Sequence, residues 1–258
     1  MVFLEIENIH HTYFSPKTAT TALENITLSI EEGEYISFLG PSGCGKTTLL
    51  SIIAGLLKPT AGTIKIDGID VKEQKSMIGY MLQQDYLFPW KTIEENILLG
   101  LKIMNKYTEE NRKNTFELLK EMNLGNVEKQ YPRELSGGMR QRVALVRTLS
   151  TNPKILLLDE PFSALDYQTK LKLEDLVFQI LKEYNKTALL VTHDIGEAIA
   201  MSDRIFLLKA NPGEIAQTFL VPEELTSITP FAARQHPKYS ELFQKIWEEL
   251  NSLESKQT

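Results

Sequence analysis

A glycine-rich run between an apolar segment and a helix-forming segment constrains this chain more than any other feature. The run reads Gly40, Pro41, Ser42, Gly43, Cys44, Gly45, Lys46, Thr47 and Thr48. It matches the phosphate-binding loop pattern, which requires a strand before the loop and a helix after it. We expect a short strand at residues 35–39 and a helix at 47–57 that ends around Gly55 and Pro59. The sequence therefore predicts a strand, a tight turn and a helix around a bound phosphate.

Each residue type in this loop has a physical purpose. Glycines allow backbone N–H groups to point at phosphate oxygens, and the start of the helix adds a partial positive charge. We expect Lys46 to reach the β- and γ-phosphates of a nucleotide and Thr47 to offer its hydroxyl to Mg²⁺. A glycine-rich turn with a chance lysine is the alternative, and the flanking strand and helix argue against it. The sequence supplies no activating base for Cys44, so we interpret it as a position that contributes its backbone.

Composition excludes several other classes of protein. The 258 residues are 42% hydrophobic and 24% charged, which is typical of a globular protein with a large core. The net charge of −6 gives no overall attraction to nucleic acid, so we predict no nucleic-acid partner. The single cysteine excludes an internal disulfide and fits a reducing compartment. The first residues lack the basic start and apolar run of a signal peptide, and no apolar run approaches the roughly 20 residues of a membrane span.

Strand and helix signals alternate along most of the chain. Residues 25–30 alternate between polar and apolar side chains like a half-buried strand, and 63–66 predict another strand. Two very apolar strands, at 155–158 and 188–191, flank a segment at 173–184 with apolar residues at helical spacing. A strand, a crossover helix and a further strand predict a parallel sheet that is covered on both faces.

Two other segments are mainly helical. From residue 90 to about 152, charge and helical periodicity dominate, and 112–122 is one expected helix. We interpret this stretch as a helical subdomain inserted in the main domain. Residues 221–258 form an expected C-terminal helical tail, with apolar residues at helical spacing between Tyr239 and Leu250. We expect the tail to pack on the body of the protein, because it is too short for an independent domain.

Two adjacent carboxylates, Asp159 and Glu160, end the apolar strand at 155–158. Ligands collect at this end of the strands in parallel sheets. We expect Asp159 to hold Mg²⁺ and Glu160 to accept a proton from an attacking water. A solvated acidic loop is the alternative, and the phosphate-binding loop upstream makes it the weaker one.

A second helix start with exposed backbone follows Leu135. Ser136 is a natural N-cap, and Gly137 and Gly138 leave the first turn bare. Taken alone, an ordinary helix start is the more common interpretation. One nucleotide does not need two such helix ends from one chain, so we infer that each chain offers this end to a nucleotide held by a second copy.

These three segments stand in the order and spacing of the ATP-binding subunit of ATP-binding cassette (ABC) transporters, which residues 1–220 resemble. The resemblance implies an α/β fold: a P-loop NTPase (RecA-like) core with a mostly parallel sheet, an antiparallel β subdomain and an inserted α-helical subdomain. It places an ABC ATPase domain at 1–220, with the helical subdomain at about 90–152, before the tail at 221–258. It implies ATP and Mg²⁺ as cofactors and disfavours a P-loop kinase or GTPase, because of the segment after Leu135.

The resemblance also assigns roles to individual residues. Gln83 matches the glutamine that contacts Mg²⁺ and the attacking water, with Gln84 as a one-residue alternative. His193 matches the switch histidine that contacts the γ-phosphate. Tyr13 is the candidate for stacking on adenine, and Phe14 is its alternative. The signature segment that acts across the dimer is Leu135, Ser136, Gly137, Gly138, Met139 and Gln141, with Met139 at a position where glutamine is frequent. The D-loop, which also works across the dimer, is Ser163, Ala164, Leu165 and Asp166.

The implied function is ATP hydrolysis that energises transport. The resemblance implies a head-to-tail dimer on the cytoplasmic face of the cell membrane, a separate integral membrane permease and, indirectly, an extracytoplasmic solute-binding protein. We expect the apolar run at 86–90 to receive a helix of the permease, with core packing as the alternative. The run at 87–90 and the segments 211–215 and 234–237 resemble importers of the nitrate, sulfonate and taurine type, or of related small organic solutes. An exporter cassette and a soluble non-transport ABC ATPase are the alternatives.

Overall fold

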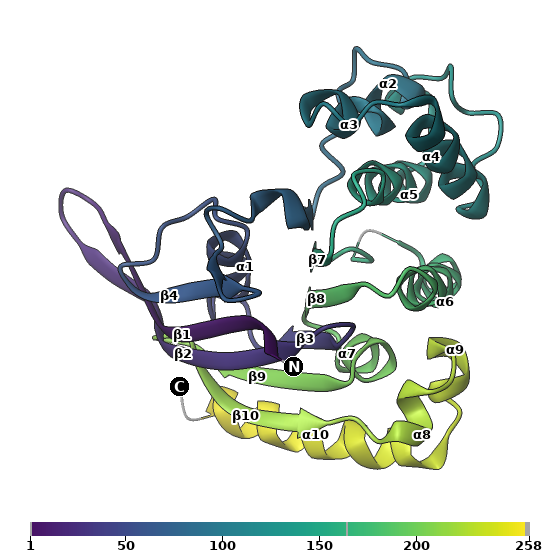
Figure 1. The fold of residues 1–258 in the computed structure, drawn as a ribbon. Helices are drawn as coiled ribbons and strands as arrows, with labels where there is room; N and C mark the ends of the chain where they lie inside the picture. The colour runs from purple at the N-terminus through teal and green to yellow at the C-terminus, as the bar shows by residue number, and fades with distance from the viewer. Residues whose placement is uncertain (1, 164, 256–258) are drawn as a thin grey trace.

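Two sheets organise the protein (Figure 1), in a computed structural model that describes residues 2–163 and 165–255. The first sheet is antiparallel, in the order β2 (Ala19–Glu31), β1 (Val2–Phe14), β4 (Ala61–Ile66) and β5 (Ile69–Asp70). The second has the order β10 (Glu214–Leu220), β9 (Arg204–Lys209), β3 (Tyr35–Leu39), β8 (Thr187–Thr192), β7 (Ile155–Asp159) and β6 (Ile78–Met81). All its neighbours are parallel except the pair β9–β10. The mostly parallel sheet and the antiparallel sheet are those that the sequence predicts.

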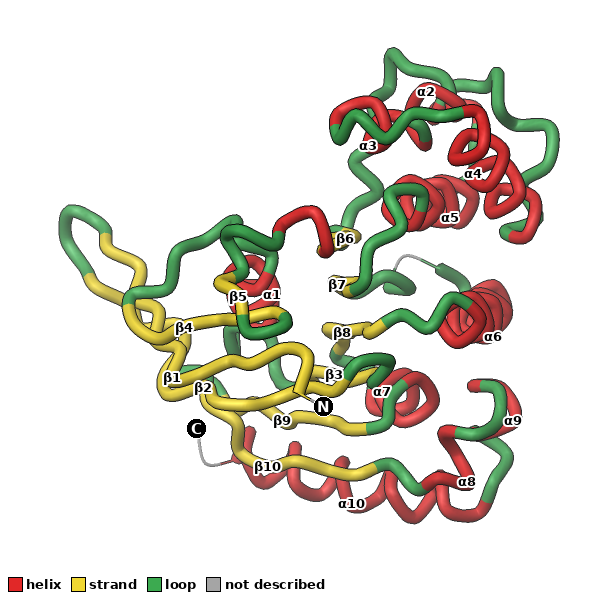
Figure 2. The backbone as a smooth tube through the Cα atoms, in the orientation of Figure 1, coloured by secondary structure: helices red, strands yellow, loops and turns green. Residues whose placement is uncertain are grey.

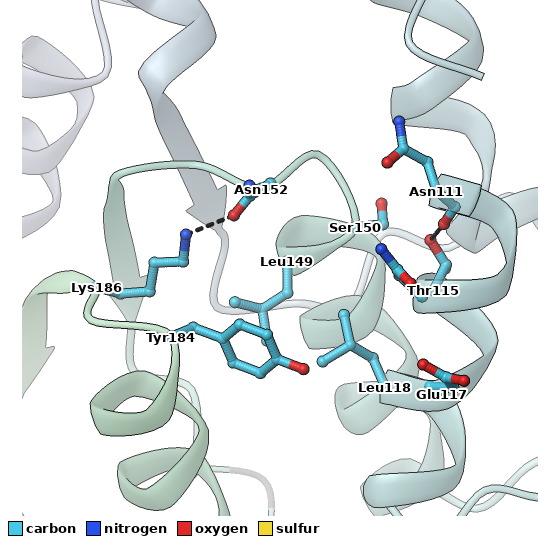
Figure 3. Close-up of a pocket in the computed structure, with 10 residues that line it drawn as sticks. Asn111, Thr115, Glu117, Leu118, Leu149, Ser150, Asn152, Tyr184 and Lys186 are labelled. Carbon is cyan, nitrogen blue, oxygen red and sulfur yellow. Dashed lines mark hydrogen bonds between the residues drawn. The ribbon is translucent and has the colours of Figure 1, made fainter. Parts of the chain in front are cut away.

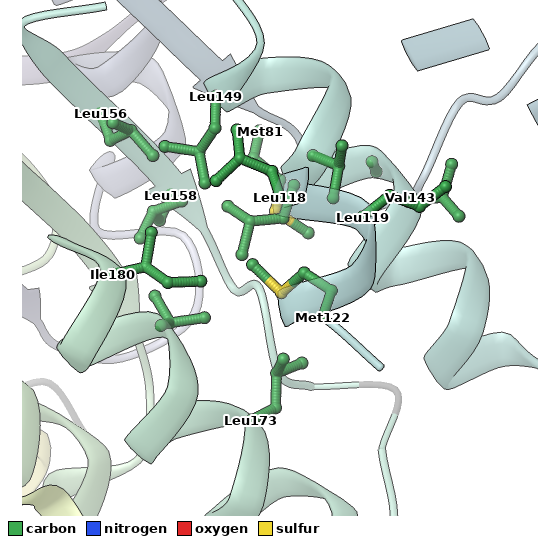
Figure 4. Close-up of a cluster of buried hydrophobic side chains, with 14 of the residues drawn as sticks. Met81, Leu118, Leu119, Met122, Val143, Leu149, Leu156, Leu158, Leu173 and Ile180 are labelled. Atoms are coloured by element: carbon green, nitrogen blue, oxygen red, sulfur yellow. The ribbon is translucent and has the colours of Figure 1, made fainter. Parts of the chain in front are cut away.

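Strand β7, which lies between β8 and β6, contributes to two cores because its side chains alternate between the faces of the sheet. Ile155 and Leu157 belong to a core shared with the antiparallel sheet and helix α1 (Lys46–Ile53). Leu156 and Leu158 belong to a second core, formed with helices on the opposite face (Figure 4). A strand that is buried on both faces is apolar at successive positions, which explains why residues 155–158 show no alternation of polar and apolar side chains.

Helix α1 is shorter than the sequence suggests. The expected helix reaches residue 57, whereas α1 ends at Ile53 with Ala54 as its C-cap. Gly55 has a φ of 65°, in the left-handed region that favours glycine, and its N–H donates to the carbonyl of Ile52. This turn ends the helix before the apolar residues that follow can extend it.

The segment between β6 and β7 is helical (Figure 2). A short 3₁₀ turn, η1 (Lys75–Met77), comes directly before β6. The helices between β6 and β7 are α2 (Ile93–Ile97), α3 (Leu99–Ile103), α4 (Glu109–Glu121) and α5 (Gly137–Leu149), with the 3₁₀ turn η2 (Pro132–Glu134) before α5. A threonine or serine hydroxyl caps the N-terminus of three of these helices: Thr92 caps α2, Thr108 caps α4 and Ser136 caps α5. The apolar faces of α4 and α5 join the second core.

Helices also cover the rest of the second sheet. They are α6 (Tyr167–Glu183), α7 (Ile195–Met201), α8 (Glu223–Thr226), α9 (Pro230–Ala233) and α10 (Pro237–Ser255). A third core joins β9 and α7 to the C-terminal helices, with Ile199, Leu207 and Ile246 fully buried in it. The C-terminal segment runs past α6 and α7 and then along β10 (Figure 1). It therefore packs on the sheet that carries the phosphate-binding loop.

Candidate nucleotide-binding site

A cavity of about 580 Å³ opens at the carboxyl ends of β3, β7 and β8. It gathers residues from the loop after β3, the first strand, the segment after β6 and the ends of β7 and β8. The lining residues are Tyr13, Ala22, Ser42, Gly43, Gly45, Lys46, Thr47, Thr48, Gln83, Glu160 and His193. Residues that lie far apart in the sequence thus meet around the phosphate-binding loop.

The loop bends tightly around the side chain of Lys46. The Lys46 Nζ donates to the carbonyl oxygens of Gly40 at 2.7 Å and Pro41 at 3.0 Å, and the side chain is buried. Gly45 has a φ of 91°, and a Cβ there would lie 2.6 Å from Leu23 Cδ2. The backbone path therefore needs glycine at this position. A phosphate bound in this loop would meet backbone N–H groups and the ammonium group of Lys46.

Cys44 is fully enclosed in this loop. Burial raises the pKa of its thiol, although the ammonium of Lys46 acts in the opposite direction. A thiol that is protonated and inaccessible is not a nucleophile. This environment agrees with the interpretation of Cys44 as a position that contributes its backbone.

Asp159 lies beside the first turn of α1. Its Oδ1 accepts a hydrogen bond from Thr47 Oγ1 at 3.2 Å, and its Oδ2 accepts one from the hydroxyl of Tyr80 at 3.5 Å. Burial raises the pKa of Asp159, so a cation beside this carboxylate would favour its charged form. Mg²⁺ usually takes one or two protein oxygens together with phosphates and water. The hydroxyl of Thr47 and the carboxylate of Asp159 fit that requirement, and the described residues contain no cluster of three acidic, histidine or cysteine side chains that could hold a metal alone.

Glu160 joins two of the predicted residues. Gln83 Nε2 donates to Glu160 Oε2 at 2.9 Å, and His193 Nδ1 lies 3.3 Å from Glu160 Oε1. The segments after β6, β7 and β8 thus meet at one carboxylate. Gln84 does not line the nucleotide cavity, and it lies instead in a neighbouring cavity of about 380 Å³. The geometry therefore favours Gln83 over Gln84.

Tyr13 lies at the edge of the nucleotide cavity. Its hydroxyl is 3.2 Å from Thr48 Oγ1, and the edge of its ring meets His11 at a centroid distance of 4.5 Å. Phe14 is 76% exposed and does not line the cavity. Of the two aromatic candidates, the structure brings Tyr13 to the loop.

The segment after Leu135 lies outside the nucleotide cavity of its own chain. Ser136 caps α5 by accepting a hydrogen bond from the Met139 N–H at 3.3 Å, and Leu135 is buried. Gly137 and Gln141 line the neighbouring cavity that also holds Gln84. A single chain therefore does not bring this helix start to its own phosphate-binding loop.

The predicted D-loop lies directly after Glu160. Ser163 Oγ donates to the carbonyl oxygen of Glu160 at 3.0 Å, and Asp166 caps α6 by accepting from the Thr169 N–H at 3.0 Å. Leu165 packs against the second core. Ala164 lies outside the described residues.

Sequence reasoning missed a set of arginine contacts beside Gln83. Arg140 Nε lies 2.9 Å from Asp85 Oδ2, and Arg147 donates to the carbonyl oxygens of Asp85 at 2.7 Å and Tyr86 at 2.8 Å. Both arginines come from α5. Their seven-residue spacing places them on one helix face and is the only local signal that could have suggested a shared partner. The segment after Gln83 is thereby clamped to the helical region.

A further cavity, of about 290 Å³, lies away from the phosphate-binding loop (Figure 3). It opens between α4, the end of α5 and the turn before β8. Lys186 Nζ donates there to Asn152 Oδ1 at 2.6 Å. None of the residues predicted for the site lines this cavity.

A strand, a phosphate-binding loop and a helix, with an acidic strand end beside them, define a P-loop NTPase. The family model described as "ABC transporter" matches residues 23–163. The chain is 63% identical to the uncharacterized ABC transporter ATP-binding protein YtlC of Bacillus subtilis, over 100% of this chain and 99% of that protein. The chain therefore belongs to the ABC transporter family, as an ATP-binding protein.

Two further similar proteins are named as import ATP-binding proteins. The chain is 43% identical to the aliphatic sulfonates import ATP-binding protein SsuB of Bacillus licheniformis, over 92% of this chain and 89% of SsuB. It is 36% identical to the nitrate import ATP-binding protein NrtD of Synechocystis, over 99% of this chain and 97% of NrtD. A dimeric structure of the ATP-binding cassette MJ0796 bound to ADP and Pi superimposes with a TM-score of 0.76, at 36% identity, over 85% of this chain and 99% of that chain.

These findings confirm the predicted family, the cassette fold and the ATPase class. The chain is an ATPase cassette that couples ATP hydrolysis to transport. In the described residues, no helix combines the length and the apolar character that a membrane span requires.

Proposed function

We propose that this chain energises the import of a small solute, of the sulfonate, nitrate or taurine type or a related organic compound, through a separate membrane permease. The observation that carries the proposal is the likeness to two import ATP-binding proteins, SsuB and NrtD, over nearly the whole chain. The aligned length extends beyond the nucleotide site into the C-terminal segment, which the phosphate chemistry alone does not require.

The nucleotide cavity supports ATP as the substrate. In the proposed complex, Lys46 exchanges its contacts with loop carbonyls for the β- and γ-phosphates, and the loop N–H groups surround the phosphate oxygens. Thr47 and Asp159 hold Mg²⁺, which supplies positive charge to the phosphates when bound. Tyr13 stacks on the adenine ring at the edge of the cavity.

Glu160 is the proposed proton acceptor for hydrolysis. The attacking water forms a bond to the γ-phosphorus, the bond to the ADP oxygen breaks, and the proton of the water passes to Glu160. Gln83 orients the water, and His193 contacts the γ-phosphate. The hydrogen bond from Gln83 and the approach of His193 to the same carboxylate support this arrangement.

A second copy of the chain is the proposed partner at each nucleotide. Ser136, Gly137 and Gly138 of one copy contact the ATP in the loop of the other, and the D-loop works across the same interface. The position of these residues outside their own nucleotide cavity supports the proposal. The similar cassette MJ0796 is itself dimeric.

The proposed contact with the permease is the segment after Gln83. Tyr86 is 58% exposed and Trp90 is 70% exposed, so both aromatic side chains are open to a partner. The contacts of Arg140 and Arg147 would carry a movement of Gln83 to this surface and to α5. On this proposal the chain sits on the cytoplasmic face of the membrane, with an extracytoplasmic solute-binding protein as an indirect partner and no nucleic acid.

Two experiments test the proposal. Glu160→Gln should retain ATP, accumulate as an ATP-bound dimer and lose at least about a hundredfold in kcat. Normal hydrolysis by this variant would show that Glu160 is not the proton acceptor. Purification of the tagged chain from membranes should recover a multi-span permease and a solute-binding protein, and deletion of the gene should abolish uptake of the bound solute. Recovery of ribosomes or DNA, or a defect in export, would refute the importer assignment.

A further inference from the structure

A chain of ion pairs runs from the C-terminal segment to the loop that carries His193. The Arg234 guanidinium, at the end of α9, lies 2.7 Å from Glu174 Oε2 on α6. Lys170, one turn earlier on α6, lies 3.9 Å from Glu174 Oε1 and 2.7 Å from Asp194 Oδ2. Asp194 directly follows His193. Glu174 is completely buried, and the side chains of Arg234 and Lys170 are each only 14% exposed.

The loop around His193 is itself held by hydrogen bonds to the same groups. Asp194 Oδ1 accepts hydrogen bonds from the N–H groups of Gly196 at 2.7 Å and Glu197 at 3.1 Å. Asp194 thereby caps the N-terminus of α7. The Thr192 hydroxyl donates to Glu197 Oε2 at 3.1 Å and accepts from the Asp194 N–H at 3.0 Å. The residues on both sides of His193 are therefore fixed by side chains that Lys170 contacts. Lys170 Nζ also lies 2.9 Å from Glu197 Oε2.

Two further contacts dock the C-terminal segment at this place. The Phe231 N–H donates to Asp175 Oδ1 on α6 at 2.8 Å, which anchors the start of α9. Tyr239 of α10 lies against the first turn of α7, since a Cβ at Gly196 would be 2.5 Å from its hydroxyl oxygen. The C-terminal helices also share a core with α7. The tail therefore touches the His193 loop through charges, through α6 and through α7.

We propose that Arg234 and Lys170 are positioning residues for hydrolysis: through Glu174 and Asp194, they hold His193 in the orientation that meets Glu160 and the γ-phosphate. This inference rests on the proposed role of His193. The side chain of His193 is 65% exposed, so packing does not fix it, and its position depends on the neighbouring residues.

The balance of charges explains how Arg234 affects the position of His193, which it does not contact. The two cations Lys170 and Arg234 face three carboxylates, those of Glu174, Asp194 and Glu197. Loss of Arg234 leaves Lys170, among the described residues, as the one cation that faces these three carboxylates. Above the raised pKa of Glu174, where its carboxyl group is charged, Lys170 then shifts toward it, because a buried carboxylate without a partner is costly. That shift weakens its hold on Asp194 and releases the segment that carries His193.

The test uses the full chain and compares Arg234→Gln with Lys238→Gln. The control removes the same charge from the same segment, where Lys238 pairs with Glu224 at the surface. We expect Arg234→Gln to lower kcat by about ten- to a hundredfold with KM for ATP changed by less than about twofold, since small misplacement of a catalytic group slows the step itself. Arg234→Lys should recover part of the rate, and Lys238→Gln should match the wild type.

A second readout does not depend on hydrolysis. The sequence has only four histidines, so labelled histidine rings give a simple NMR spectrum in which His193→Ala identifies the His193 signal. Arg234→Gln should shift or broaden that signal and leave those of His10 and His11 in place, whereas Lys238→Gln should leave the His193 signal unchanged. If Arg234→Gln does not fold, Lys170→Gln removes the cation that contacts Asp194 directly and takes its place in both measurements.

The outcomes separate the two proposals. An unmoved His193 signal, or a kcat within about twofold of the Lys238→Gln control, overturns the positioning role of Arg234. A kcat unchanged in His193→Ala instead overturns the role of His193, while the NMR comparison still decides whether the tail controls the loop. A lower rate in Arg234→Gln together with a displaced His193 signal supports the inference.

Discussion

Replacement of Glu174 by glutamine should stabilise the protein at pH 8 and leave its stability nearly unchanged at pH 5. Burial raises the pKa of Glu174 to about 7, and it outweighs the opposing effect of Arg234. The other groups that face this carboxyl are Lys170 on its own helix, Asp194 and Glu197 from the loop and start of α7, and Tyr239 from α10. A neutral amide of the same shape avoids the cost of a buried charge.

The sign and size follow from proton binding. The ordinary pKa of the group is 4.5, so between that value and about 7 the folded protein holds a proton that the unfolded chain has released. The contribution of Glu174 to stability is therefore complete below pH 4.5 and is lost as the pH rises through about 7. The loss is about 3 kcal/mol, since one pKa unit corresponds to roughly 1.4 kcal/mol. For a chain of this length that equals a shift in Tm of about 6–12 °C.

Thermal unfolding followed by circular dichroism at pH 5 and pH 8 measures this effect. The Tm of Glu174→Gln relative to wild type should rise by that amount between the two pH values. Glu224→Gln is the control, because its exposed pairing with Lys238 lowers the pKa of Glu224, and its relative Tm should not rise with pH. A Tm difference for Glu174→Gln that is constant, or that falls at pH 8, would refute the reasoning and show that Arg234 keeps Glu174 ionised.

Three further outcomes are expected. Lys46→Ala and Ser136→Arg chains should each lack ATPase activity, yet a mixture should regain some, because one shared site in the mixed dimer is intact; no recovery would contradict the head-to-tail arrangement. Tyr13→Ala should weaken ATP binding in calorimetry by about tenfold, as expected for a lost stacking contact, and Phe14→Ala should not. Leu157→Ala should lower the free energy of unfolding by about 2–5 kcal/mol in urea, and a smaller loss would show that the core collapses around the cavity.

Features that depend on adjacent residues were predictable from the sequence. The phosphate-binding loop is one continuous run, so its pattern and its flanking strand and helix are all local. The same holds for β7, whose unbroken apolar run reflects burial on both faces, and for α10, whose apolar residues recur at helical spacing. The family resemblance then extended this local information to Gln83 and His193.

Local signals were weaker where tertiary contacts decide the structure. Strand β2 begins at Ala19, earlier than its alternating residues suggest, because pairing with β1 extends the hairpin through polar residues. Tyr80 carries no motif, yet its hydroxyl reaches Asp159. The spacing of Arg140 and Arg147 places them on one helix face, but it does not name the backbone carbonyls near Gln83 that Arg147 contacts.

The sequence by itself determined the fold class, the phosphate chemistry and the candidate catalytic side chains, because a short run of adjacent residues identifies each of them. The tertiary structure decided which of those side chains meet: Gln83 and His193 at Glu160, and Arg234 and Lys170 at Glu174. These groups come from different strands and helices, so their proximity depends on the strand order and on the docking of the tail. The sequence around a charged side chain does not identify its partner. Only tertiary packing brings the two groups together and removes the water between them.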